Sequence, residues 1–151
     1  MSFIGQAEVT IDKKARLAVP AKFRTELESS GLGPGWVSMP REEGMLWLIP
    51  EKGFARLSEG WGDSLIPDED TAALQRALFS FSEKVDMDAA GRVTLPRRHM
   101  ELTGLDGEVA VIGAMSHLEV HDRATWMEKE RQRLSQLPAL IAKISARRIQ
   151  G

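Results

Sequence analysis

Two acid–arginine pairs recur in the sequence with the same internal spacing. Asp12 precedes Arg16 by four residues, and Asp88 precedes Arg92 by four residues, 76 positions further along the chain. A guanidinium group is permanently charged and presents several donors in a rigid fork, so it can bind phosphates or the edge of a guanine. An acid four residues earlier can hydrogen-bond the amides of a tight turn. Each pair therefore predicts an arginine held at the tip of a turn.

A purely structural role for each pair is the alternative. An exposed ion pair contributes only about 0 to 1 kcal/mol to stability, and duplication of a chain would preserve a structural pair as well. Two equivalent basic turns could instead engage successive turns of a duplex. The two turns also differ, because Gly91 precedes Arg92 whereas Ala15 precedes Arg16. Both interpretations remain open at this point.

The segments around the two pairs repeat as well. Residues 8–24 align with residues 84–100 without a gap, so that Pro20 matches Pro96. Period-two alternation of apolar residues predicts two strands joined by a turn in each copy, and a proline suits the first turn of a following helix. The predicted strands are 7–11, 16–19, 81–87 and 92–95, and the predicted helices are 20–29 and 96–102. Each copy is too short to bury a core alone, so the two are expected to pack together.

The remaining segments give further predicted elements. Strand pairs are expected at 36–39 with 45–49 and at 109–113 with 117–121, and helices at 51–59 and from Asp122. A linker is expected over 61–70, with Asp68 capping a helix that carries Leu74 and Leu78. Pro138 is expected to interrupt the helix before a tail helix with an apolar stripe, which its own chain or a neighbouring subunit would cover. The predicted units are a first module (1–60), a linker helix region (61–78), a second module (79–134) and a tail helix (135–151).

Positive charge is concentrated in the two repeated segments. The net charge is -2, but residues 8–24 carry five Lys or Arg against two acids, and residues 84–100 carry four against two. An acidic body with two basic faces would steer towards an anion. Ordinary solvated turns and helix faces are the alternative explanation of the same charges.

Several other classes of function are disfavoured. The chain has no cysteine, which excludes disulfides and cysteine-ligated metals, and no Ser/His/Asp or paired-acid motif indicates an enzyme. His117 and His121 would lie roughly 13 Å apart on a strand, too far to share a metal ion. The longest apolar run, residues 109–115, is far shorter than the roughly 20 residues of a membrane span. A cytoplasmic protein without metal or cofactor is expected.

Aromatic residues and glycines are assigned structural roles. Trp36, Trp47 and Trp126 lie in or beside apolar patterns, which favours core or interface packing over stacking on bases. The GLGPG segment at residues 31–35 is not followed by the lysine and serine or threonine of a phosphate-binding loop. It is therefore predicted to be a connector.

The repeated segments resemble the MraZ family of bacterial transcriptional regulators. The resemblance rests on FIGQAEVTIDKKARLAVPAKFR at the start of the chain and on VDMDAAGRVTLPRRHM in the second copy, each with the signature D-x-x-x-R. It implies an α+β, mostly β fold, a pseudo-twofold, duplicated AbrB-like swapped-hairpin barrel with flanking helices. It also implies a ring-like homo-oligomer in the nucleoid that binds repeated promoter elements in double-stranded DNA and controls the division and cell-wall gene cluster.

The resemblance implies DNA contact through Arg16 and Arg92, with turns organised by Asp12 and Asp88. Ala15 departs from the glycine that the family commonly has before the first arginine. Further candidates for DNA contact are six other basic residues of the repeated segments, namely Lys13, Lys14, Lys22, Arg24, Arg97 and Arg98. One alternative is a ring-forming structural or protein-interaction module of the same fold without sequence-specific DNA binding. A small-ligand or enzymatic role between the two halves is a third possibility.

Overall fold

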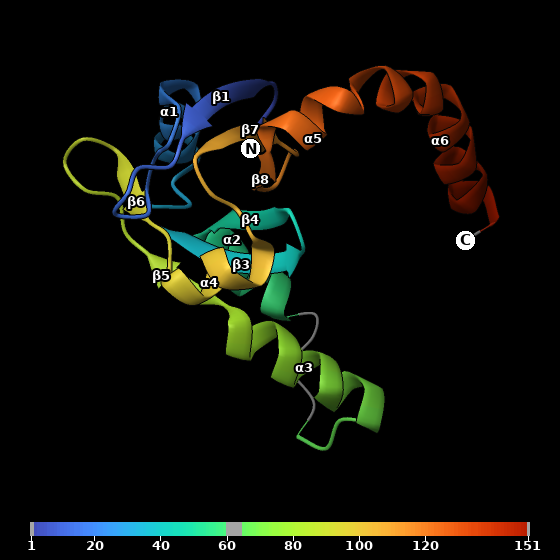
Figure 1. Cartoon of the computed structure of the whole chain (residues 1–151). Helices are drawn as coiled ribbons and strands as arrows, with labels where there is room; N and C mark the ends of the chain where they lie inside the picture. Colours follow the sequence, from blue (N-terminus) through green and yellow to red (C-terminus); the bar gives the residue numbers. More distant parts are fainter. Residues whose placement is uncertain (1, 60–64, 151) are drawn as a thin grey trace.

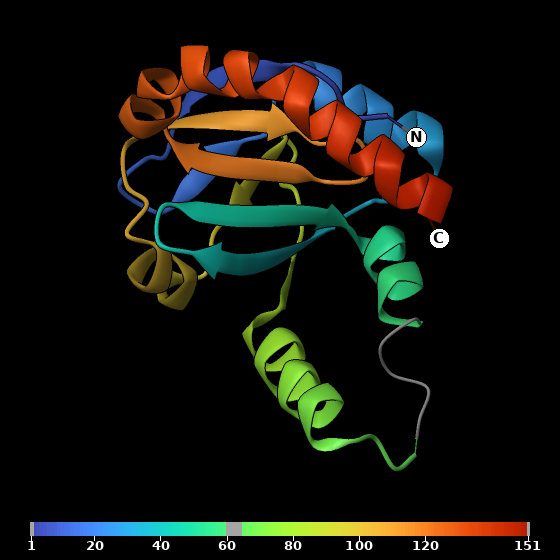
Figure 2. The same cartoon turned by 90° about the vertical axis from the view of Figure 1, so that its right-hand side faces the viewer.

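A six-stranded antiparallel sheet and a separate two-stranded ribbon form the β structure of residues 2–59 and 65–150, which the computed structural model describes. The strand order in the sheet is β1-β7-β8-β4-β3-β5, and the ribbon is β2-β6. Figures 1 and 2 show the sheet with helices at its ends and along one side. The strands are β1 (Gln6–Thr10), β2 (Arg16–Ala18), β3 (Trp36–Glu42), β4 (Met45–Pro50), β5 (Glu83–Val85), β6 (Arg92–Thr94), β7 (Glu108–Gly113) and β8 (Leu118–Asp122).

Equivalent helices follow the two prolines of the repeat, as predicted. The first begins after Pro20 and ends at Gly31, and the second begins after Pro96 and ends at Gly104. Both glycines adopt the left-handed conformation, with φ of 68° and 71°, which ends a helix at little cost in a residue without Cβ. The helices are α1 (Ala21–Ser30), α2 (Glu51–Glu59), α3 (Glu69–Phe81), α4 (Arg97–Thr103), α5 (Arg123–Glu128) and α6 (Glu130–Gln150).

The two copies exchange strands. β1 of the first copy pairs with β7, and β2 pairs with β6 of the second copy. The Asp12 amide still donates to the Arg16 carbonyl at 3.0 Å, so the predicted turn closes, but the strands on either side of it separate. The prediction of a local two-strand pairing is therefore wrong for the first copy, and in the second copy the local pairing is limited to a single antiparallel bridge between Met87 and Val93. Leu17 and Val93 face each other across β2 and β6 with no exposed surface, so the exchange places both at the centre of the core.

The α+β class is confirmed, and two finer expectations are wrong. The six-stranded sheet is open, with β1 and β5 as its unpaired edges, because the β2-β6 ribbon forms a separate sheet instead of closing a barrel. The chain is also not mostly β, since the helices contain more residues than the strands. The predicted strand over 81–87 shrinks to β5 because α3 continues through Phe81.

The main core lies between the sheet, the ribbon and α1. Trp36 is fully buried there, as predicted, and its ring lies 5.6 Å from that of Phe3. A buried hydrogen bond of 2.8 Å between the Ser38 hydroxyl and His99 Nδ1 joins β3 to α4. Burial lowers the pKa of His99, so this imidazole stays neutral in the interior. These contacts fix the second-copy helix against the sheet.

The last helix differs from its prediction. α6 runs through Pro138 as one helix of 21 residues, so the expected interruption is wrong, although Figure 1 shows the helix curving away from the body. Asp68 caps α3 as predicted, because its carboxylate accepts from the Thr71 amide at 2.7 Å. Residues 61–64 of the predicted linker lie outside the described residues. No helix in the described part of the chain has the length and apolarity to cross a membrane.

Candidate nucleic-acid interface

The first turn is organised by one carboxylate. Asp12 Oδ1 accepts from the amides of Lys14 and Arg16, both at 2.9 Å, and Oδ2 accepts from Arg16 Nε at 2.7 Å. These bonds, led by the one from the Arg16 amide, hold the pKa of Asp12 below its usual value. The carboxylate is therefore ionised near neutral pH and fixes both the turn and the arginine.

The second turn has the same construction. Asp88 Oδ1 accepts from the amides of Ala90 at 2.9 Å and Arg92 at 3.0 Å, and Oδ2 accepts from Arg92 Nε at 2.8 Å. The amide of Arg92 is again the main cause that lowers the pKa of Asp88. The two signature motifs thus build one arrangement twice.

Each signature arginine is held by Nε and leaves its outer nitrogens open. The side chains of Arg16 and Arg92 are 31% and 38% exposed. Within residues 2–59 and 65–150, neither guanidinium has a further hydrogen-bond or ion-pair partner at its Nη nitrogens. A guanidinium fixed in this way presents a pre-oriented pair of donors to an anion or a base edge.

The β2-β6 ribbon places both arginines on one face. Side chains alternate along a strand, and Arg16 and Arg92 each lie one position from the buried pair Leu17 and Val93. The arginines are diagonal neighbours in this register, a relationship that separates Cα atoms by about 7–8 Å. One helical turn of a DNA duplex is about 34 Å long, several times the separation of the two arginines. The expectation that the two Asp–Arg turns of a single chain engage successive helical turns of a duplex is therefore wrong.

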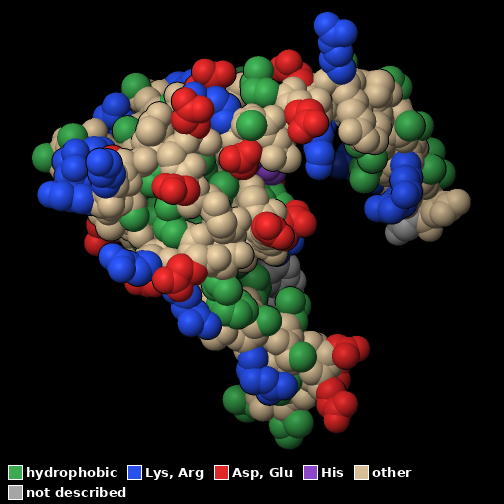
Figure 3. All heavy atoms as spheres, in the orientation of Figure 1, with side chains coloured by type: hydrophobic (Ala, Val, Ile, Leu, Met, Phe, Trp, Pro, Cys, Tyr) green, Lys and Arg blue, Asp and Glu red, His purple; other side chains and the backbone are tan. Residues whose placement is uncertain are grey.

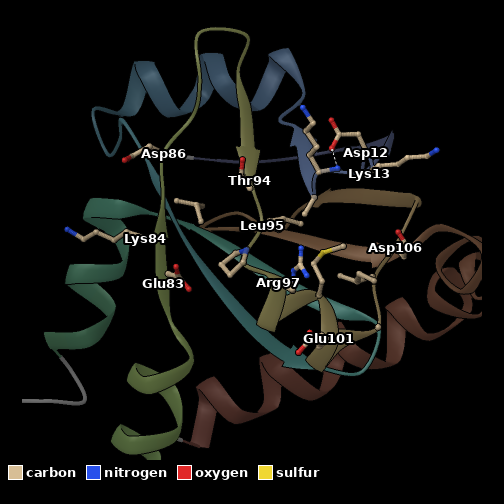
Figure 4. Close-up of a pocket in the computed structure, with 17 residues that line it drawn as sticks. Asp12, Lys13, Glu83, Lys84, Asp86, Thr94, Leu95, Arg97, Glu101 and Asp106 are labelled. Atoms are coloured by element: carbon tan, nitrogen blue, oxygen red, sulfur yellow. Dashed lines mark hydrogen bonds between the residues drawn. The ribbon is translucent and has the colours of Figure 1, made fainter.

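Three of the other predicted basic residues line one cavity beside the first turn. Lys13 and Lys14 are exposed in the first turn and line a cavity together with Arg97 of α4. Figure 4 shows Asp12 and Lys13 on one side of this cavity and Lys84 and Glu83 on the other. The cavity also contains Asp86, Glu101 and Asp106, so its charge is mixed. In Figure 3, Lys and Arg side chains gather at the edge of the molecule near β6 and its turn.

Three further candidates lie on the helices. Lys22 donates to the Gln6 carbonyl at 2.9 Å and covers the Phe23 ring at 5.1 Å, so its ammonium is engaged within the protein. Arg24 donates from Nε to the Val19 carbonyl at 3.0 Å and lies beside the second turn. Arg98 is exposed on α4.

A cluster on β8 was not found from the sequence. The Glu119 carboxylate forms hydrogen bonds with His121 Nε2 at 2.8 Å and with His117 Nε2 at 3.2 Å. The bond with His117, followed by the bond with His121, lowers the pKa of Glu119 to about 2. The ring of Trp47 stacks on that of His117 with 3.8 Å between the ring centroids, and the centroids of Trp126 and His121 lie 4.5 Å apart. Both tryptophans are half-buried and pack against this cluster. The alternation of HLEVH is the signal that could have placed the three polar side chains on one face. Among the described residues, no group of three ligating side chains could hold a metal ion.

Comparisons with known proteins agree on one family. A family model described as "MraZ protein, putative antitoxin-like" matches residues 78–148. Three similar proteins are each named transcriptional regulator MraZ. The protein of Moorella thermoacetica is 32% identical over 142 residues, which are 94% of this chain and 96% of that protein. Those of Kocuria rhizophila and an Arthrobacter species are 35% and 34% identical, with coverage of 83% of this chain and 85% of each relative.

Proposed function

The chain belongs to the MraZ family, and on that premise we propose that it is a sequence-specific DNA-binding transcriptional regulator. The name shared by its relatives supports a role in transcription regulation. The observation that carries the proposal for this chain is the duplicated turn, in which Asp12 and Asp88 orient Arg16 and Arg92 on the outer face of one ribbon. The proposed targets are repeated promoter elements of the division and cell-wall gene cluster, which the family resemblance implied.

The proposed contact follows from the chemistry of the guanidinium. An arginine can bind O6 and N7 of guanine in the major groove with two hydrogen bonds, which are worth about 1–3 kcal/mol of discrimination. Because Asp12 and Asp88 already hold Nε of each arginine, little side-chain freedom would be lost on binding. Lys13 and Lys14 are exposed beside the first arginine and are proposed to contact phosphates, which position a protein without reading sequence.

The proposed fold relationship is a pair of AbrB-like swapped-hairpin modules in one polypeptide. The support is the exchange of β2 and β6 between the copies, together with equivalent turns and helices in each. In this proposal the modules are residues 1–60 and 79–134, the linker helix region is 61–78, and the tail helix is 135–151.

We propose a ring-like homo-oligomer as the DNA-binding species. α6 exposes an apolar stripe that the described body leaves uncovered, and stripes of this kind are typical of protein–protein contacts. The chain has a net charge of -2 and few cations near each turn. Several subunits that bind spaced repeats together would multiply weak individual contacts through their effective concentration. The stripe consists of Leu134, Leu137, Leu140, Ile141 and Ile144.

Selection of duplexes from a random library tests this function. The full chain should enrich a short motif that recurs at regular spacing, and it should bind the recovered repeats more tightly than a scrambled duplex of the same composition. A reporter driven by the recovered repeats should change its output when the protein is present. Equal affinity for recovered and scrambled duplexes would contradict sequence-specific regulation.

A ring-forming structural or protein-interaction module is the second candidate. The acidic net charge and the exposed stripe on α6 favour it, because neither feature requires a nucleic acid. Under this alternative the chain assembles normally but binds neither duplex at moderate salt. The selection experiment, accompanied by light scattering of the same sample, separates the two.

A further inference from the structure

The two turns differ at the residue that precedes the arginine. This residue is Ala15 in the first turn and Gly91 in the second, and both have a left-handed backbone, with φ of 60° and 77°. Because Ala15 adopts this conformation with a Cβ, the backbone alone does not require glycine in the second turn. A neighbouring group must account for the difference.

That neighbour is Arg24 on α1 of the other copy. A Cβ added to Gly91 would lie 2.6 Å from Arg24 Cδ, 2.8 Å from Nε and 2.9 Å from Nη1. Arg24 is held in this position because its Nε donates to the Val19 carbonyl at 3.0 Å, while the Val19 amide donates to the Gly91 carbonyl at 3.0 Å. The missing side chain of Gly91 therefore leaves room for the guanidinium of Arg24.

The first turn has the complementary arrangement. Arg24 aligns with Met100 in the repeat, and Met100 lines the cavity beside Ala15. A turn with alanine thus faces a helix with methionine, and a turn with glycine faces a helix with arginine. The close approach is therefore specific to the second turn, where a Cβ on residue 91 would meet Arg24.

The presence of Arg24 beside the second turn also compensates for a difference in charge between the two turns. The first turn carries Lys13 and Lys14, whereas the second has Ala89 and Ala90 at the aligned positions. Arg24 is exposed, and in the described part of the chain it makes no ion pair within 4 Å. Its Nη nitrogens are therefore free to bind an anion that approaches the second turn.

We propose that Arg24 supplies to the second turn the phosphate contact that Lys13 and Lys14 supply to the first, and that Gly91 is glycine to admit it. This inference rests on the proposed DNA-binding function and assigns to α1 of the first copy a part in the contact made by the second. Both turns then carry cations beside the signature arginine, but from different elements.

Salt dependence of duplex binding tests the contact. Binding of the selected repeats is measured between about 50 and 200 mM salt for the wild type, Arg24→Met, and Arg76→Met as a matched control on α3. Each lost phosphate contact reduces the slope of log affinity against log salt by roughly 0.9. Arg24→Met should therefore flatten the slope by about one for each engaged subunit and weaken binding several-fold at low salt. Arg76→Met should leave both unchanged.

A double substitution tests the shared space independently of DNA. Gly91→Ala alone should lower the midpoint of thermal unfolding. The double variant Arg24→Met, Gly91→Ala reproduces the residue types of Met100 and Ala15 and should recover most of that loss. An unchanged salt slope in Arg24→Met, or no recovery in the double variant, would overturn this inference alone. Absence of duplex binding by the wild type would overturn both it and the proposed function.

Discussion

Arg16 and Arg92 lie diagonally across the β2-β6 ribbon on the face opposite the buried Leu17 and Val93, although 76 residues separate them in sequence. Each arginine is oriented by an aspartate of its own copy and positioned by a strand of the other. The exchange of strands is therefore what makes two separate motifs into one surface.

The ribbon should be sensitive to loss of its buried centre. Leu17→Ala removes a fully buried side chain, and changes of this kind cost about 2–5 kcal/mol. The free energy of unfolding from urea titration should fall by that amount, and duplex binding should weaken because both turns lose their support. Ile66→Ala, at a position 90% exposed and outside the α6 stripe, is the control and should change stability little. A Leu17→Ala variant as stable as this control would show that the ribbon does not hold the turns in place.

The acids of the turns should titrate below their ordinary range. Hydrogen bonds from the following arginines lower the pKa of Asp12 and Asp88 from 3.8. Because the folded value is depressed, their contribution to stability is complete above the ordinary value and is lost as pH falls through the lower folded value. Carbon-13 NMR of the carboxyl groups should give midpoints below 3.8, with Asp12→Asn and Asp88→Asn used for assignment. Midpoints at or above 3.8 would show that the turn bonds do not form in solution.

The β8 cluster should contribute a second, separate acid response. Bonds from His117 and His121 lower the pKa of Glu119 to about 2 from 4.5. Its stabilisation is therefore complete above about pH 4.5 and disappears progressively towards pH 2. Unfolding measured between these limits should show a smaller pH dependence in Glu119→Gln than in the wild type. Identical profiles would mean that the carboxylate is not paired with the imidazoles.

The apolar stripe of α6 should be required for assembly of subunits but not for folding of the chain. Ile141 and Ile144 are 58% and 47% exposed and belong to no buried cluster in the described part of the chain. Ile141→Glu with Ile144→Glu should reduce the mass found by light scattering while the circular dichroism spectrum is retained. Lys143→Gln, an exposed change on the same helix, should leave the mass unaltered. A normal mass in the double variant would assign the subunit contacts to another surface.

Local features of the fold could be predicted because their causes lie close together in sequence. Pro20 and Pro96 start helices through their own geometry, and Asp12 and Asp88 bond amides only two and four residues away. The family was recognised from the same repeated residues, and the comparisons confirm it.

Relationships between distant segments were harder to predict. The pairing of β2 with β6 depends on which partner buries Leu17 and Val93, and periodicity within one strand does not contain that choice. Gly91 could be recognised as a turn residue, but its need to accommodate Arg24 arises only where the two copies meet. The continuity of α6 through Pro138 also escaped prediction, because a proline is normally unfavourable inside a helix.

Titration of Arg16→Ala and Arg92→Ala against the selected repeats and a scrambled duplex tests the central claim most directly, with Arg76→Ala as control and the mass of each variant checked. Each signature variant should lose affinity for the repeats by about 5- to 150-fold for each engaged subunit, the equivalent of the roughly 1–3 kcal/mol of one bidentate contact, and should approach its affinity for the scrambled duplex. Wild-type affinity for the repeats in both signature variants would contradict the assignment of DNA recognition to these two arginines.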